Sequence, residues 1–175
     1  SGDVENLGGT IEADRAILLN VAGNFKHSST SHTSEVNENG YQRTDTRQGR
    51  KGLLHVKGED GELQVSANNI DVTGADILNE GKGRTYVSAK NKMSLGTLEV
   101  GFSEKMGGGN HTRVERVTES LISRVKGQGD VVLSGKDIWS AGAELEAKNK
   151  FMALAENDLV LGTATVDSDF EEFHQ

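Results

Sequence analysis

A group of cationic residues between positions 41 and 51 is the part of the sequence best suited to bind a ligand. Arginine and lysine side chains pair with carboxylates, sulfates and phosphates. The group consists of Tyr41, Arg43, Arg47, Arg50 and Lys51. It could grip an anionic glycan or lipopolysaccharide. The alternative, which we favour, is that these charges blunt the edge of a projecting strand and prevent aggregation.

The histidines and acidic residues do not show the spacing of a metal or catalytic site. There is no HExxH segment, no EF-hand loop and no GxSxG elbow, and no Gly-rich segment has the spacing of a dinucleotide fingerprint. We interpret the histidines as solvated loop side chains, and we expect no catalytic residue, no cofactor and no metal ion. The histidines are His27, His32, His55, His111 and His174.

The composition excludes several other classes of protein. The chain has 175 residues and a formal net charge of −8, which disfavours binding to nucleic acid or to an anionic membrane. It has no apolar stretch long enough for a membrane-spanning helix. It contains 22 Gly but no Pro and no Cys, which suits long, continuous backbone ladders. Since the sequence begins in mid-pattern, we expect it to be a piece of a longer protein.

An internal repeat is the strongest signal in the sequence. Residues 61–77 align without a gap on residues 129–145, and residues 85–100 align on residues 151–166. A fainter copy opens the chain at residues 8–25. Identical Gly, Ser and Ala residues and matching apolar positions recur at a nearly fixed separation, which is typical of solenoid proteins.

Short alternating strands lie within each copy, at intervals of roughly seven residues. They are expected at residues 63–65, 70–72, 77–78, 85–87, 93–95 and 98–100. Three such strands make a coil of about 22 residues, the size of a β-helix rung. We therefore predict an all-β chain folded as a right-handed parallel β-helix, a single domain over residues 1–175. A β-sandwich is the alternative, but it gives no reason for near-identical units at fixed separation.

Two polar stretches interrupt the coils, at about residues 26–52 and 101–120. Each contains a turn signal, Asn39-Gly40 in the first and Gly107-Gly108-Gly109-Asn110 in the second, flanked by alternating polar and β-forming residues. We predict that each excursion is a long β-hairpin that projects from the solenoid or lies along it. We take Val56-Lys57-Gly58 and Val125-Lys126-Gly127 as the equivalent segments in which the two excursions return to the coils.

The tail, residues 167–175, departs from the repeat. Phe170 and Phe173 are three residues apart, and Ser168 or Asp169 could cap a short helix. Such a helix would lie across the last coil and protect its open ladder.

The motif at residues 129–147 resembles the filamentous haemagglutinin repeats of two-partner-secretion exoproteins. That family shows a rhythm of G-[DN]-V-x-[IL]-x-A-G-x-D-[IV] followed by G-[AS]-x-[IL]-x-A, and here Ser134-Gly135 replaces the usual Ala-Gly pair. The residues that carry the likeness are Gly129, Asp130, Val131, Leu133, Asp137, Ile138, Gly142, Ala143, Leu145 and Ala147.

The resemblance implies a long filament at the surface of a Gram-negative bacterium, secreted through an outer-membrane transporter that acts on another region. Such proteins are adhesins, haemolysins or stalks that carry toxins in contact-dependent growth inhibition. We therefore expect a structural stalk segment whose partner is the remainder of the same exoprotein. An adhesin module that binds a cell-surface receptor or glycan through the excursions is the alternative.

A polysaccharide-degrading enzyme on a β-helix is a less favoured reading. Such a site needs carboxylates clustered on one side of successive coils. In the aligned copies Asp71 falls on Trp139 and Glu99 falls on Thr165, and only Asp76 and Glu144 both retain charge. The sequence therefore shows no row of carboxylates, and we expect the chain not to be an enzyme.

Overall fold

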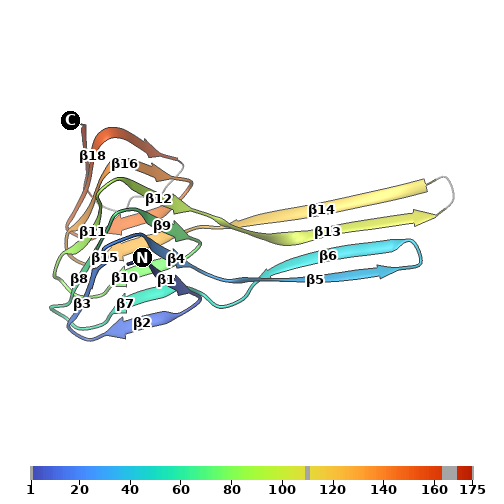
Figure 1. Ribbon diagram of the computed structural model, residues 1–175, viewed down its shortest axis with the longest axis horizontal. Coiled ribbons are helices and arrows are strands. Elements are labelled where there is room, and N and C mark those ends of the chain that lie inside the picture. Colours follow the sequence, from blue (N-terminus) through green and yellow to red (C-terminus); the bar gives the residue numbers. More distant parts are fainter. Residues whose placement is uncertain (1, 109–110, 163–168, 175) are drawn as a thin grey trace.

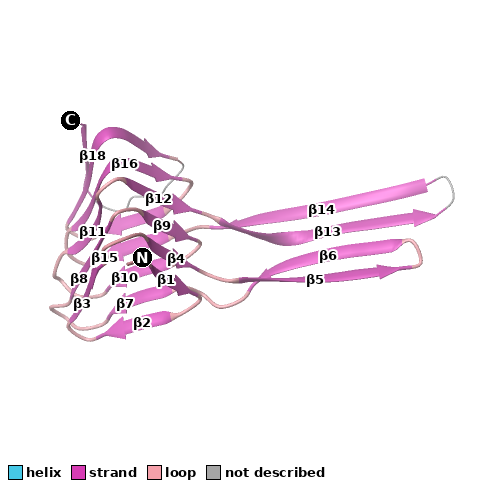
Figure 2. Cartoon of the chain, viewed as in Figure 1, coloured by secondary structure: helices cyan, strands magenta, loops and turns pink. Residues whose placement is uncertain are grey.

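Every regular element of the described chain is a β-strand. The computed structural model describes residues 2–108, 111–162 and 169–174, with the backbone alone for residues 108, 111 and 169–174. The strands form a 10-stranded, a 5-stranded and a 4-stranded sheet, and the described residues contain no helix (Figure 2). No helix that could cross a membrane is therefore found among these residues. The all-β prediction is confirmed.

Most strands belong to three stacks of parallel strands, which form the left-hand part of Figure 1. Stack 1 contains β1 (Val4–Leu7), β4 (Phe25–Ser28), β9 (Ile70–Thr73) and β12 (Lys92–Gly96). Stack 2 contains β2 (Thr10–Ala13), β7 (Leu53–Val56), β10 (Asp76–Asn79), β15 (Arg124–Gly127) and β17 (Glu144–Ala147). Stack 3 contains β3 (Ala16–Asn20), β8 (Glu62–Ala67), β11 (Thr85–Ala89) and β19 (Asp169–His174).

Two long strands join stack 3 to stack 1. The first half of β16 (Val131–Ser140) pairs with β11 and its second half pairs with β12, and β18 (Lys150–Leu161) follows β16 along its length. The chain thus visits stacks 1, 2 and 3 in turn and then returns to stack 1. We call one such circuit a pass. Successive passes lie directly on one another because their strands pair in register.

Alternation along each strand produces the core. In β8, Leu63 and Val65 are fully buried, whereas Glu62 and Gln64 point outward. Parallel register then places like residues in columns, so that Val65 pairs with Val87 and Val87 with Leu133. The buried apolar side chains of all three stacks form one hydrophobic cluster. The period-2 pattern of the sequence is therefore the pattern of the core.

The sequence repeat corresponds to two passes. Leu63 and Val131 align in the repeat, and the structure places them on either side of Thr85 in one column. Ile77 and Leu145 likewise flank Val125. A pass that carries a hairpin alternates with a pass that does not, which explains why the repeat is longer than one coil.

Two details of the predicted coils are wrong. Residues 98–100 are not the third strand of their coil but the start of β13 (Leu98–Gly108), and β15 supplies the third strand. The predicted equivalence of Val56 and Val125 is also wrong. Ile77 pairs with Val125 on one side and with Leu54 on the other, so Val125 occupies the same column as Leu54 and not as Val56.

The two excursions are hairpins, as predicted, and they form one antiparallel sheet. β5 (Ser31–Glu38) and β6 (Tyr41–Gln48) make the first hairpin, and β13 and β14 (His111–Leu121) make the second. β6 also pairs with β13, so the strand order is β14-β13-β6-β5. We call this the hairpin sheet, and it projects from the stacked strands in Figure 1.

The first hairpin is shorter than the predicted excursion of residues 26–52, and the second is slightly longer than residues 101–120. Lys26, His27 and Ser28 belong to β4 and pair with β9. The second hairpin begins at Leu98, whose β-carbon would lie 2.6 Å from a β-carbon on Gly74. Gly74 has a φ of +57°, and it makes the turn of the intervening pass at this corner. The absence of a side chain there lets the base of the second hairpin lie against that turn.

The tail is a strand and not a helix. β19 pairs in parallel with β18, from Lys150↔Asp169 to Ala155↔His174, so it extends stack 3. Of the two predicted caps, Ser168 lies outside the described residues, and Asp169 is the first residue of β19. An extended segment satisfies the unpaired backbone groups of the last strand directly, which a helix laid across it could not do.

His27 is a polar member of the core, contrary to the interpretation of the histidines as solvated. Its ring is fully buried and stacks on Phe25, with the ring centroids 5.9 Å apart. Its Nε2 atom lies 2.9 Å from the Asp76 carbonyl oxygen and therefore carries the proton, and Nδ1 accepts a bond of 3.2 Å from the Asn6 amide. Both ring nitrogens are satisfied by a neutral imidazole.

A core truncation should distinguish the columns from the outer faces. Leu133→Ala, at a fully buried site, should lower the free energy of unfolding by about 2–5 kcal/mol, because it leaves a cavity between neighbouring passes. Leu18→Ala, at a side chain that is 68% exposed, should change it by less than about 0.5 kcal/mol. Urea denaturation followed by circular dichroism measures both. Equal losses would contradict the assignment of inward and outward faces.

The stability of the chain should depend on pH through His27. Burial lowers the pKa of His27 below its ordinary value of 6.5, and the hydrogen bond to the Asp76 carbonyl and the Asp76 charge oppose this only in part. The unfolded chain therefore binds a proton that the folded chain does not, and the free energy of unfolding should fall as pH drops below about 6.5. The loss should level off below the folded-state pKa.

Two variants separate this effect from other titrations. His27→Gln should have a smaller slope of unfolding free energy against pH just below pH 6.5, while His32→Gln, on the exposed strand β5, should keep the wild-type slope. Chemical denaturation at a series of pH values gives these slopes. If His27→Gln retained the full slope, another group would be responsible.

Candidate functional site

The five residues predicted to bind an anionic ligand are spread along the first hairpin. Tyr41, Arg43 and Arg47 lie on one face of β6, because they alternate along the strand. Arg50 and Lys51 follow the base of β6, whereas Tyr41 is at the tip. At about 3.3 Å per residue, Tyr41 and Lys51 are therefore roughly 30 Å apart. The structure does not gather them into one cluster.

Arg43, on the first hairpin, contacts side chains of both hairpins. Its Nε atom lies 2.9 Å from Asp45 Oδ2, its Nη1 lies 3.1 Å from Glu104 Oε2, and its guanidinium carbon is 4.4 Å from the Phe102 ring centroid. The Asp45 hydrogen bond raises the pKa of Arg43, and Arg43 in turn lowers the pKa of Asp45. With both ion pairs and the ring contact made inside the sheet, Arg43 has little capacity left for a ligand.

Lys51 is the counter-ion of a buried carboxylate. Its Nζ lies 2.9 Å from Oδ2 of Asp76, a residue that is only 5% exposed. The other oxygen, Asp76 Oδ1, has no hydrogen-bond partner among the described residues. The Lys51 ammonium therefore supplies most of the compensation for this charge where the first hairpin rejoins stack 2.

The favoured explanation for the cationic group also needs revision. β6 is an interior strand of the hairpin sheet, paired with β5 on one side and β13 on the other. Its charges therefore do not protect a free edge. Arg47 is 78% exposed and 3.9 Å from Asp45, so it is the member of the group most open to solvent on β6.

The hairpin tips are fixed by a tight turn and by contact with each other. Asn39 and Gly40 have φ values of 44° and 82° in a two-residue loop between Glu38 and Tyr41, as expected for a type I′ hairpin. The Gly107 amide donates a 3.0 Å hydrogen bond to the Gly40 carbonyl. The predicted turn at Asn39-Gly40 is confirmed, while Gly109 and Asn110 lie outside the described residues.

The opposite face of the hairpin sheet is rich in hydroxyl groups, and sequence reasoning missed it. We call it the hydroxyl face. Thr44 pairs with Ser103, and Ser103 with Arg116. In the next row, Thr46 pairs with Gly101 and Gly101 with Thr118, while Thr33 Oγ1 lies 3.2 Å from Thr46 Oγ1. The sequence does show Ser and Thr at alternating positions in these strands. Their hydroxyls come together on one face only because β6 pairs with β13.

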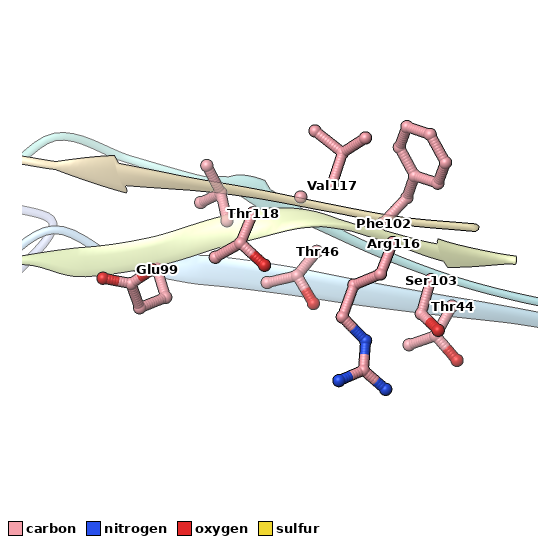
Figure 3. A pocket seen from close by; sticks show the side chains of 10 residues that line it. Thr44, Thr46, Glu99, Phe102, Ser103, Arg116, Val117 and Thr118 are labelled. Carbon is pink, nitrogen blue, oxygen red and sulfur yellow. The ribbon is translucent and has the colours of Figure 1, made fainter. Parts of the chain in front are cut away.

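A hollow of about 210 Å³ lies in the hydroxyl face over Gly101. Gly101 has a φ of +142°, and a β-carbon there would be 2.0 Å from the Val117 carbonyl oxygen. A side chain is therefore excluded from the middle of the row. Figure 3 shows the Arg116, Glu99 and Thr46 side chains on one side of the sheet, and Phe102 and Val117 on the other.

Opposite charges flank the hollow. Glu99 Oε1 accepts hydrogen bonds from Ser120 Oγ at 2.6 Å and from Thr97 Oγ1 at 3.0 Å, which hold the carboxylate in place. The Arg116 guanidinium makes no ion pair or hydrogen bond with another described residue. The hollow therefore offers one free cation, one oriented carboxylate and several hydroxyls.

Acidic residues elsewhere are paired or dispersed. Ser94 pairs with Asp71 in one neighbouring strand and with Trp139 in the other, so this column holds no row of carboxylates. Glu144 is held by Arg124 at 3.2 Å and Lys126 at 3.0 Å. Among the residues that the structure describes, no group of three or more His, Asp or Glu side chains could hold a metal ion.

Comparison of the chain with protein-family models, with curated proteins and with solved structures gives no match.

Because of the Lys51–Asp76 pair, we expect replacement of Lys51 and replacement of Arg47 to change the free energy of unfolding unequally. Lys51→Met, which keeps the aliphatic stem, should lower the free energy of unfolding by about 1–3 kcal/mol because it leaves the buried Asp76 uncompensated. Arg47→Met should change it by less than about 0.5 kcal/mol, since an exposed charge contributes little. Urea denaturation near neutral pH tests both, and equal effects would mean that the Asp76 charge is compensated by other groups.

Proposed function

We propose that the chain is a stalk segment of a large secreted exoprotein at the surface of a Gram-negative bacterium. Its three stacks close around one core as a right-handed parallel β-helix, which spaces and presents a distal adhesive or toxin domain. The chain itself carries out no catalysis. The observation that carries this proposal is the in-register parallel pairing of successive passes, from β3 through β8, β11 and β16 to β18.

Physical arguments support closure and handedness. Buried residues of all three stacks belong to one hydrophobic cluster, as expected when three stacks enclose a common interior. Connections between parallel strands of one sheet are right-handed in nearly all proteins, because right-twisted strands return most easily that way. Each further pass adds about 4.8 Å along the axis, so repetition produces a long rod.

Charge ladders on the outer face of stack 2 would stiffen such a rod. Glu12 forms an ion pair with Lys57 in the next pass, and His55 lies 3.4 Å from Glu12 and 3.1 Å from Glu80. Arg124, Glu144, Lys126, Glu146 and Lys148 continue the ladder with contacts of 2.8–3.6 Å. Each exposed pair contributes little energy, but the ladders bridge three of the interfaces between passes.

The cellular assignment rests on the resemblance of residues 129–147 to filamentous haemagglutinin repeats. The proposed partners are the remainder of the same exoprotein and an outer-membrane transporter that acts on another region. The net charge of −8 gives no support to nucleic acid as a partner. Adhesion to a receptor or glycan is the second candidate function, and the free Arg116 beside a hydroxyl-lined hollow favours it.

Tandem duplication tests the stalk proposal. Leu54, Ile77 and Val125 occupy one column, so a copy of residues 54–124 inserted after Arg124 should add two passes without changing the register. Four copies inserted in tandem should add eight passes and so lengthen the particle, as a rigid rod, by about 40 Å. Small-angle X-ray scattering and electron microscopy measure the length.

A Gly/Ser insertion of equal length is the matched control, because it should give a flexible extension with no added rod. If the duplicated chain formed separate globules, or a particle no longer than the original, the stalk proposal would fail.

A further inference from the structure

We infer that the hollow over Gly101 is a binding site for an acidic sugar, a pyranose ring that carries a carboxylate. The inference goes beyond the stalk role and does not depend on it, since it rests only on the hairpin sheet. Its central observation is that a free guanidinium, an oriented carboxylate and a ring of hydroxyls surround a hollow that the backbone keeps open.

The cations on this face are available to a ligand. Arg43, on the opposite face, already contacts two carboxylates, whereas the Arg116 guanidinium forms no ion pair or hydrogen bond with a described residue. Lys105 projects from the hydroxyl face one row nearer the tip, opposite Val114, and it too has no partner among the described residues. Two neighbouring cations without counter-ions favour an anion, and the planar guanidinium fits a carboxylate best.

The remaining groups match a sugar ring. Thr44, Thr46, Ser103 and Thr118 contribute hydroxyls that both donate and accept hydrogen bonds, as the hydroxyls of a pyranose do. Glu99 accepts hydrogen bonds from Ser120 and Thr97, which fix its side chain, so it suits a sugar hydroxyl that donates to it. A carboxylate at Arg116 and a hydroxyl at Glu99 would set the direction of the ring across the hollow.

An acidic peptide fits this site less well. The hollow is lined by residues of β6, β13 and β14. β6 and β13 have partners on both sides, and the side of β14 that faces the hollow is paired with β13. A peptide lying over the hollow therefore finds no free backbone edge within it, and its main-chain groups would be left unpaired. The Phe102 and Val117 side chains point to the other side of the sheet, so the hollow has no apolar pocket for a peptide side chain.

Binding can be measured on the whole 175-residue chain by isothermal titration calorimetry and by amide chemical shifts. The probes are trigalacturonate and sialyllactose, which carry their carboxylates on different sugars. Methyl-esterified trigalacturonate and lactose are the matched neutral probes. We expect at least one acidic probe to bind about tenfold or more tightly than its neutral match, with shift changes centred on Gly101, because a charge-assisted hydrogen bond is lost in the neutral form.

Variants on the two faces of β14 provide the control. Arg116→Gln should weaken binding of the acidic probe by about tenfold or more, whereas Arg113→Gln, on the opposite face and beside Glu115, should leave it unchanged. Thr46→Val and Thr118→Val keep the shape and the β propensity but remove the hydroxyls, so each should weaken binding several-fold. Circular dichroism confirms that each variant is folded.

Several results would overturn the inference. They are absence of binding to both acidic probes, equal binding of the neutral probes, equal losses for Arg113→Gln and Arg116→Gln, and equal or tighter binding of hexaglutamate. None of these outcomes affects the length measurement on the duplicated chain. Failure of the glycan site and failure of the stalk proposal are therefore distinguishable.

Discussion

The fold depends on parallel backbone pairing between one pass of the chain and the next. Side chains alternate along each strand, so a one-residue slip between passes would move the buried column to solvent. The columns themselves resist such a slip. Phe25, Ile70, Met93 and Ile138 form one of them, and the small residues Ala67 and Ala89 form another at the corner. Pairing and packing specify the same register, and regular geometry follows from that agreement.

Several buried polar groups in the core have a hydrogen-bond partner close by, whereas Thr85 Oγ1 and Asp76 Oδ1 have none among the described residues. His27 lies between Asn6 and the Asp76 carbonyl, and Ser29 Oγ donates to the Gly74 carbonyl at 2.6 Å. Ser123 Oγ similarly donates to the Gly96 carbonyl at 2.6 Å. Ser29 and Ser123 lie where the chain leaves or rejoins the stacks beside the hairpins. These bonds satisfy carbonyl groups at a corner where regular ladder pairing stops.

The sequence reveals whatever is periodic and hides whatever depends on distant partners. The alternation in residues 62–67 and the repeat were sufficient to predict the β-strands, and turn signals such as Asn39-Gly40 predicted the two hairpins. The polar run at residues 26–29 was assigned to the first excursion because its buried hydrogen bonds come from residues such as Asn6 and Asp76, far along the chain. The phenylalanine spacing in the tail spans too few residues to distinguish a helix from a strand. The hollow over Gly101 requires the pairing of β6 with β13, which no local pattern shows.

The pairing of β6 with β13 also has a mechanical consequence. These strands leave the second and fourth passes, and the third pass, which turns at Gly74, lies between them. The two hairpins therefore tie together layers that do not touch each other in the stacks. Rotation or stretching of one layer relative to the other must slide β6 along β13 and strain the Arg43–Glu104 contact. The projecting sheet thus acts as an external brace, which resists torsion at a distance from the axis where its leverage is greatest.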